Sequence, residues 1–286
     1  MKMSTAKRDA IIATLLSTAS GRNTIASELQ LPLRQYQDYE AVGRSALMID
    51  RLPAGQRPYY DKDIDTPAFI IGENGETIMS QIKGESVYVP LMVISANPEI
   101  PLTQTQDRRF DVQNRVKVKT KHEVFRIEDR KIFALMRQAV TGDTVPNAPI
   151  TIATADATID QFSEAMSLIE RHGLLRCRNI YMNGGNTKII RKLGKDYYEP
   201  SLTGELLKTG FTGTLMGASV HISPEIPVGE IYFTAEPEFT GVLTESLPLT
   251  VISADAPTRL AVGFVVYERV GIAITNAKAV SCLKLI

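Results

Sequence analysis

The sequence has no tryptophan, two cysteines and three histidines among its 286 residues. Two cysteines, Cys177 and Cys282, are too few for a disulfide framework or a four-cysteine zinc site, and a reducing compartment is the simplest origin. The histidines show no metal-binding spacing, and the glycine loops form neither a phosphate loop nor a G-x-S-x-G elbow. We therefore expect no metal, no cofactor and no catalytic residue, although a Ser–His–acid triad assembled by the fold stays open.

The chain also lacks net charge, because 32 lysines and arginines balance 32 aspartates and glutamates. A neutral balance argues against a surface that wraps nucleic acid on all sides, and it offers little repulsion against self-association. No apolar run approaches the ~18 residues of a membrane span, so we expect no membrane contact. The apolar run 10–16 is short for a secretory signal and borders Asp9, so we expect no signal peptide.

What the sequence does contain begins with two helical patterns, over residues 4–20 and 33–48, where apolar side chains recur near helical spacing. Segment 49–68 differs, because its three prolines and its Asp-Lys-Asp-Ile-Asp run cannot form a core alone. We expect an extended arm there. Asp61, Asp63 and Asp65 imitate the start of a calcium loop, but the glycine and glutamate that such a loop requires further on are missing, so we expect no calcium.

A hairpin signal follows the arm. Two apolar runs, 69–71 and 77–79, flank a turn at Asn74-Gly75, which supplies the positive φ angles of a tight hairpin. Arms of ~10–15 residues would project ~35–50 Å at ~3.3 Å per residue. Such a hairpin is too long and thin to be covered by its own chain, and we expect it to need partner surface.

Residues 108–121 alternate in polarity, which predicts a strand with Lys117, Lys119 and Lys121 on one face. With Arg108, Arg109 and Arg115 these lysines form a basic set, and a solvated face is its default interpretation. The alternatives are a salt-bridging surface for a neighbouring subunit and contact with packaged nucleic acid, although no aromatic side chain is interleaved for base stacking. We predict that the lysines meet acidic groups of another subunit, and the arm offers three aspartates of matching spacing.

A helix is predicted over 126–140, with Glu128 and Asp129 in a first turn where the helix dipole favours anions. Its apolar stripe includes Phe133 and Met136. Beyond it, Thr158 and Gln161 resemble a capping box that opens a helix closed by Gly173. Further strands are predicted at 174–182, 214–222, 229–235, 248–253, 261–274 and 279–285. The fold class is α+β, with one extended part and one compact part from about residue 143 onward.

Taken in order, these parts resemble the Hong Kong 97-like fold of tailed-bacteriophage major capsid proteins. The phrases that carry the resemblance cover most of the chain beyond residue 50, and their order is more specific than any one of them. They are Leu52-Pro53-Ala54-Gly55 before Pro58-Tyr59-Tyr60, residues 85–90 (ESVYVP), 123–133 (EVFRIEDRKIF), 209–217 (TGFTGTLMG) with 220–223 (VHIS), and 267–274 (YERVGIAI).

The resemblance implies four parts. They are an N-terminal arm with helices (1–55), an E-loop hairpin (56–92) lying over a neighbouring subunit, a peripheral domain (93–149) with the spine helix 126–140, and an axial domain (150–286). Part of the C-terminal strands is expected to return to the peripheral domain. The candidate inter-subunit contacts are Asp61, Asp63, Asp65, Asn74, Gly75, Lys117, Lys119 and Lys121.

The resemblance further implies a structural protein and no enzyme. Many copies would assemble as hexamers and pentamers into an icosahedral phage head around double-stranded DNA, in the virion, after assembly in the host cytoplasm. The expected partners are copies of the same chain, portal, scaffold and possible decoration proteins, and DNA contacted without sequence preference. Only a short stretch precedes the arm, so we expect any scaffold to be a separate protein. No motif nominates a Lys–Asn crosslink.

Two alternatives remain at this point. An encapsulin-type nanocompartment shares this fold and encloses protein cargo, and a soluble enzyme of an unrelated α+β fold would not assemble at all. Size-exclusion chromatography separates the enzyme from both shells. Nuclease-protected DNA inside the native particle separates a phage head from an encapsulin.

Overall fold

The computed structural model describes residues 39, 41–53, 55–61, 86–101, 112–142, 145–154, 157–192, 213–254 and 257–286. The chain divides into two compact units. The first unit comprises Met1–Tyr39, Ala96–His122 and Val251–Val266, and the second comprises Glu40–Ser95, Glu123–Thr250 and Tyr267–Ile286. Most described residues belong to the second unit, which contains both main hydrophobic clusters.

A six-stranded sheet forms the centre of the second unit, with the strand order β6-β13-β10-β7-β9-β8. β10 pairs antiparallel with both β13 and β7, whereas β6 runs parallel to β13 and β9 runs parallel to β7. The bounds are β6 Ile150–Ile152, β7 Asn179–Met182, β8 Thr214–Leu215, β9 Ala218–Ile222, β10 Glu230–Thr234 and β13 Val280–Leu285.

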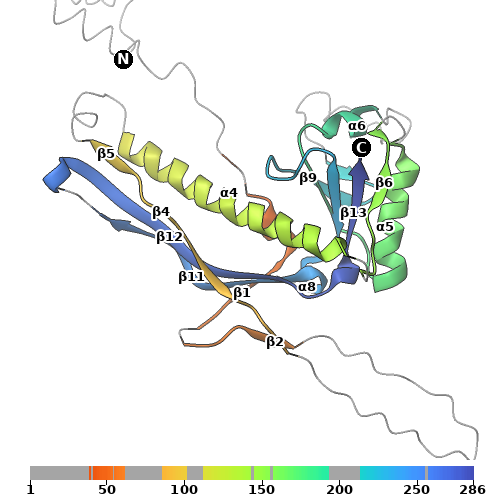
Figure 1. Ribbon diagram of the computed structural model, residues 1–286, viewed down its shortest axis with the longest axis horizontal. Helices are drawn as coiled ribbons and strands as arrows, with labels where there is room; N and C mark the ends of the chain where they lie inside the picture. Colours follow the sequence, from red (N-terminus) through yellow and green to blue (C-terminus); the bar gives the residue numbers. More distant parts are fainter. Residues whose placement is uncertain are drawn as a thin grey trace, which may run out of the picture. The chain divides into compact units, whose positions relative to one another are not determined.

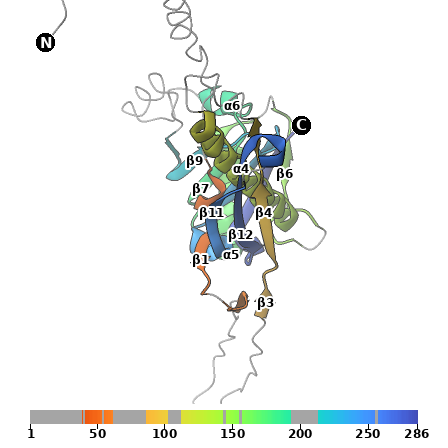
Figure 2. The same cartoon turned by 90° about the vertical axis from the view of Figure 1, so that its left-hand side faces the viewer.

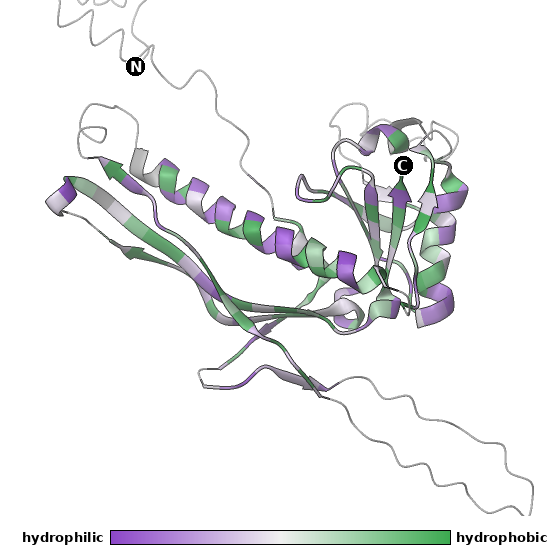
Figure 3. Ribbon diagram, in the orientation of Figure 1, coloured by the Kyte–Doolittle hydropathy of each residue, from purple (hydrophilic) through white to green (hydrophobic). Residues whose placement is uncertain are grey.

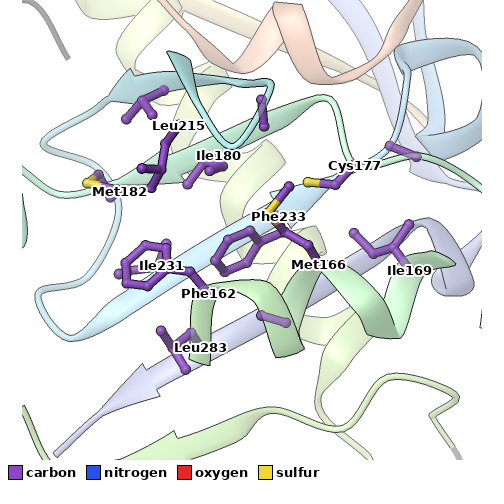
Figure 4. Close-up of a cluster of buried hydrophobic side chains, with 14 of the residues drawn as sticks. Phe162, Met166, Ile169, Cys177, Ile180, Met182, Leu215, Ile231, Phe233 and Leu283 are labelled. Atoms are coloured by element: carbon purple, nitrogen blue, oxygen red, sulfur yellow. The ribbon is translucent and has the colours of Figure 1, made fainter. Parts of the chain in front are cut away.

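Helix α5 (Ile159–Gly173) covers one face of this sheet (Figure 1). Its capping box is confirmed, because the Thr158 N–H donates to Gln161 Oε1 at 2.8 Å, and the helix ends at Gly173 as predicted. The apolar stripe of α5 enters a cluster in which Phe162 and Phe233 meet edge to face, with ring centroids 5.8 Å apart (Figure 4). Burial of this stripe explains why a 15-residue helix is stable here.

The other face of the sheet is buried as well. Successive side chains of a strand point to opposite faces. In β7, Ile180 and Met182 therefore join the α5 cluster, while Tyr181 joins a second cluster with Phe133 and Met136. These last two residues lie on α4 and are 2% and 0% exposed, so the predicted apolar stripe is confirmed. The central strands are apolar on both faces because helices cover both.

Helix α4 runs over Val112–Val140, so the predicted start at residue 126 and the predicted strand over 108–121 are both wrong. No glycine or proline interrupts the 29 residues, and lysine, arginine, glutamate and glutamine are good helix formers. The alternation around the three lysines spans too few residues to outweigh this. A buried residue recurs at every fourth position from Thr120 to Val140, which is a helical stripe. Figure 3 shows hydrophobic and hydrophilic residues alternating along α4.

A second sheet has the strand order β1-β11-β12-β4, with β5 also pairing with β12. β1 and β4 are the outer strands of this order (Figure 2). The long strands β11 and β12 contribute residues to both units. The bounds are β1 Met48–Arg51, β4 Leu91–Ala96, β5 Glu99–Pro101, β11 Gly241–Ser253 and β12 Ala261–Ile274.

The helix predicted over 33–48 is wrong at its described end. Residues Gly43–Ala46 form a single 3-10 turn, η1, and β1 begins at Met48. The N–H groups of Val42 and Gly43 each donate to the Asp129 carboxylate at 3.0 Å and do not continue a helix. The helix predicted over 4–20 lies outside the described residues.

The remaining described elements are short. β2 (Tyr59–Asp61) pairs antiparallel with β3 (Ser86–Tyr88), in the register Tyr59 to Tyr88. The predicted turn at Asn74-Gly75 lies between these strands and outside the described residues. No helix among the described residues is long and apolar enough to cross a membrane. The other bounds are α6 Thr187–Lys192, α8 Pro237–Thr240, η3 Pro257–Arg259 and η4 Ala277–Ala279.

Candidate functional site

The predicted contact residues are only partly within the described chain. Asp61 is exposed at the end of β2. Lys117, Lys119 and Lys121 lie on α4, so they cannot share one face as they would on a strand. On a helix, residues four apart lie on one side and residues two apart lie nearly opposite. Lys117 packs its ammonium 5.6 Å from the centroid of the Phe264 ring, within the first unit.

The proposed three-lysine face is therefore wrong as geometry, although contact of an individual lysine with another subunit stays a prediction. The remaining candidates, Asp63, Asp65, Asn74 and Gly75, lie outside the described residues. The strongest polar feature of the described structure is a buried cluster of charges, which none of the sequence predictions included.

Four side chains from four elements form this buried charge cluster: Arg44 of η1, Glu128 of α4, Glu245 of β11 and Glu268 of β12. Arg44 donates from Nε and Nη2 to the two oxygens of Glu128, at 2.9 and 2.8 Å. It also donates from Nη2 to Glu268 Oε2 at 3.2 Å, and its Nη1 lies 3.6 Å from Glu245 Oε1. One guanidinium therefore joins a 3-10 turn, a helix and two strands.

The carboxylates of this cluster are almost free of solvent. The side chains of Glu268, Glu128 and Glu245 are 0%, 1% and 6% exposed, while that of Arg44 is 25% exposed. Burial alone would lower the pKa of Arg44, but the hydrogen bond and the charge of Glu128, with the other two glutamates, raise it. Arg44 therefore stays charged and its guanidinium also lies 5.0 Å from the centroid of the Phe125 ring.

Asp129, the residue after Glu128 on α4, also binds the segment around Arg44, through backbone N–H groups. It is fully buried and accepts the N–H groups of Val42 and Gly43, one on each oxygen. Gly43 is required by this close approach, because a Cβ there would lie 2.6 Å from Asp129 Oδ1. The sequence placed Glu128 and Asp129 in a first helical turn, but they lie in the middle of α4 and bind residues 42–44.

A second arginine–glutamate group lies further along the same helix. Arg126 and Arg130 both donate to Glu225, whose side chain is 5% exposed. Burial alone would raise the pKa of Glu225, but the hydrogen bonds and charges of Arg130 and Arg126 lower it. Arg137 donates to Glu230 of β10 in the same way. α4 thus makes ion pairs on several of its turns as well as apolar contacts.

The base of the predicted hairpin is fixed to the second sheet. The Tyr60 hydroxyl of β2 donates to Asp50 Oδ2 at 2.5 Å, and it lies 2.8 Å from the Thr244 hydroxyl of β11. Burial, followed by the hydrogen bond to Asp50, raises the pKa of Tyr60 to about 12. Tyr59 and Tyr88, also at the hairpin base, are about half exposed, and their rings contact each other at a tilt of 50° with centroids 5.3 Å apart.

Apolar side chains also reach the surface beside β1. Met48, Ile49 and Phe239 are 45 to 48% exposed. Leu47, Met48 and Ile49 line a hollow of about 450 Å³ together with Arg178 and residues 236–238. Among the described strands, β1 lies at one edge of its sheet, so this surface combines a strand edge with apolar side chains.

The described residues offer little that resembles reactive chemistry. Cys177 and Cys282 are both buried, and burial raises the pKa of each thiol to about 12, which disfavours the reactive thiolate. Within the part of the chain that the structure describes, no group of three acidic, histidine or cysteine side chains is arranged to hold a metal ion. His172 is engaged with Asn147, at 2.8 Å from Nδ1 to Oδ1.

One sequence signal could have indicated the buried charge cluster. Glu128 stands between Val124 and Ile132 in the four-residue repeat of the α4 stripe, where an apolar residue is expected. A charged side chain on a buried stripe requires a partner. That partner is Arg44, which lies 84 positions from Glu128 in the sequence, so the spacing of residues could not identify it.

Comparison with known proteins agrees with this architecture. A family model described as the phage capsid family matches residues 44–285. The structure is similar to one from Microbacterium phage Oxtober96, with TM-score 0.67, 13% identity, and 90% of this chain and 94% of that chain covered. The mature capsid of bacteriophage PhiM1 gives TM-score 0.66 at 10% identity, with 88% and 89% covered.

A virus-like particle from Pyrococcus furiosus is also similar, with TM-score 0.50 and 15% identity, over 84% of this chain and 90% of that chain. No curated protein matches by sequence. At these identities the structural likeness shows the fold, whereas the family match rests on the sequence of most of the chain.

Proposed function

This chain belongs to the phage capsid family, and we propose that its copies assemble as hexamers and pentamers around double-stranded DNA. The match over residues 44–285 is the observation that carries the function, and it identifies a major capsid protein of an icosahedral shell, with the Hong Kong 97-like fold. The role is structural. The protein resides in the virion, and we place its assembly in the host cytoplasm.

The segment between β2 and β3 is proposed to lie over a neighbouring subunit as the E-loop, within 56–92. Three described features support this. β2 and β3 pair antiparallel, which sends the chain out and back. Tyr60 anchors the base to β1 and β11. Two half-exposed tyrosines at the base offer apolar surface to a partner.

We retain the remaining expectations as parts of this proposal: the arm at 1–55, the peripheral domain at 93–149 and the axial domain at 150–286. The spine helix within them is α4, which begins at Val112. The proposed partners beyond other copies are a portal, a scaffold, decoration proteins, and DNA bound without sequence preference. An encapsulin shell is less favoured, because the family model that matches most of the chain is that of phage capsids.

The test is to purify native particles, image them by cryo-electron microscopy and digest them with nuclease before and after opening the shell. We expect icosahedral particles with hexameric and pentameric capsomers and DNA that resists nuclease until the shell opens. Protected protein cargo without DNA would instead support the encapsulin shell. Both the phage head and the encapsulin shell would be contradicted if the chain stayed monomeric under every condition in which related capsid proteins form particles.

A further inference from the structure

Glu268 holds an oxygen without a hydrogen-bond donor in the middle of the second unit. Its side chain is 0% exposed, and its Oε2 accepts from Arg44 at 3.2 Å. Its Oε1 is buried and has no donor among the described residues. A buried carboxylate oxygen without a donor is costly, so the arrangement requires a physical explanation.

The charges around Glu268 do not balance. Glu128, Glu245 and Glu268 bring three carboxyl groups, whereas Arg44 is the one cation that contacts all three. Arg51 adds a second cation, but it bonds to Glu245 alone, at 3.0 Å, and its side chain is 85% exposed. The pair of Glu128 and Glu268 therefore shares one guanidinium between two buried carboxyl groups.

Among the described residues, the other elements around Glu268 supply no further charge that would balance these carboxyl groups. β4, which pairs with β12, has the sequence LMVISA and carries no titratable side chain. Asp129 on α4 is occupied by the N–H groups of Val42 and Gly43. The charged groups that face Glu268 are thus Arg44 from η1, Glu128 from α4 and Glu245 from β11.

A proton resolves both problems together. If Glu268 is a neutral acid, its hydroxyl donates to Glu128, the other oxygen still accepts from Arg44, and the excess negative charge disappears. Burial, then the charge and hydrogen bond of Glu128, raise the pKa of Glu268 to about 8 against the opposing effect of Arg44. Two carboxyl groups that share one proton are a recognised consequence of such crowding.

We propose that Glu268 and Glu128 share a proton at neutral pH and that this pair is an alkaline-sensitive latch, which attaches residues 42–44 and α4 to β12. When the proton leaves, two carboxylates face each other in a site with one shared guanidinium. Their repulsion weakens the contact between η1, α4 and the strands β11 and β12.

The sign of the effect on stability follows from proton linkage. The pKa of Glu268 in the folded chain lies above that of an ordinary glutamate, so the folded state holds a proton that the unfolded chain has released. The stabilisation is fully present below the ordinary carboxyl pKa. It is lost as the pH rises through about 8.

The first test detects the proton directly. Infrared spectroscopy of the full chain should show the carbonyl band of a protonated carboxylic acid at neutral pH, and the band should disappear as the pH is raised to about 9. Wild-type protein alone is sufficient for this titration. Absence of any such band at neutral pH would overturn the proposal. The Glu268→Gln variant assigns the band, because it should lack it.

The second test measures thermal unfolding between about pH 6 and about pH 9. Wild type should lose several degrees of unfolding temperature over this range, whereas Glu268→Gln should lose much less, because a neutral amide also donates to Glu128. Glu164→Gln, an exposed glutamate of α5, is the matched control and should follow wild type. Parallel curves for wild type and Glu268→Gln would overturn the latch.

Discussion

Gly43 shows how a single residue decides the attachment of the segment that precedes β1. Its N–H donates to the buried Asp129 carboxylate, and a methyl group at this position would lie 2.6 Å from Asp129 Oδ1 and 2.9 Å from Ile132 Cδ1. Both neighbours are themselves buried on α4. The absence of a side chain is therefore what allows the backbone to reach the helix.

We predict that Gly43→Ala lowers the free energy of unfolding by ~1–3 kcal/mol, because the added methyl group must displace a bonded carboxylate. Chemical denaturation of the full chain measures this. Gly184→Ala is the control, because its added methyl would come no closer than 3.8 Å to a neighbour. Equal stability of the two variants would show that the contact with Asp129 is not tight.

Single side chains also matter in the core, where Phe133 and Met136 are the examples. Both lie in the buried cluster between α4 and the six-stranded sheet, and the Phe133 ring lies 5.8 Å from the Tyr181 ring. Truncation of either to alanine should cost ~2–5 kcal/mol through lost burial and a residual cavity. Lys131→Ala, on the exposed side of α4, should change stability little. A cost near zero for both core variants would contradict the packing described here.

Among the secondary-structure elements, α4 and the β2–β3 pair differ in how much surface they bury within their own chain. α4 buries one stripe within its own chain and adds ion pairs to Glu225 and Glu230, so it is part of the folded core. β2 and β3 contribute only three residues each, with exposed outer positions, and bury little. A thin two-stranded ribbon is marginally stable alone, so we expect a partner subunit to stabilise it.

We therefore predict that deletion of residues 69–82, replaced by a short glycine linker, leaves a folded subunit that no longer forms shells. The deletion retains β2, β3 and the Tyr60 anchor. Circular dichroism should remain close to that of wild type, while size-exclusion chromatography should show monomers or small oligomers. Shells of normal size and yield would show that the segment is dispensable.

For the molecule as a whole, the neutral net charge is expected to influence assembly more than any one ion pair does. Equal numbers of acids and bases allow copies to approach without overall repulsion, and a small contact is then repeated at every equivalent interface of the shell. A single exposed pair contributes only ~0–1 kcal/mol. Repetition makes assembly sensitive to charge reversal and to salt.

Lys121 and Asp61 are the exposed members of the predicted basic and acidic sets within the described chain. If they meet between subunits, Lys121→Glu should reduce shell yield at low salt, with a normally folded subunit. The double variant Lys121→Glu with Asp61→Lys should restore the yield. Light scattering of assembly reactions at low and high salt measures both. Unchanged yield for the single variant at every salt concentration would refute this contact.

The α+β class, the α5 helix with its capping box, and parts of the C-terminal strands could be predicted from the sequence, although β7 begins at Asn179 and not at residue 174, and β11 begins at Gly241 and not at residue 248. These predictions depend on local signals, namely helical or two-residue periodicity, a cap, and turn residues, and each signal is complete within a few residues of the chain. The family was indicated by a resemblance in the order of several sequence phrases. The sequence also predicted that Phe133 and Met136 share a buried stripe, because helical spacing alone fixes which side chains lie together.

The start of α4 and the charge cluster could not be predicted from local sequence patterns and became evident in the folded structure. The alternation around Lys117, Lys119 and Lys121 is compatible with a strand, and the burial of every fourth residue from Thr120 onward outweighs it. Glu128 looks like a residue placed for the helix dipole until Arg44 is brought to it from 84 positions away. Electrostatic partners that are distant in sequence leave no periodic pattern, since their contact is created by the packing of the apolar stripes.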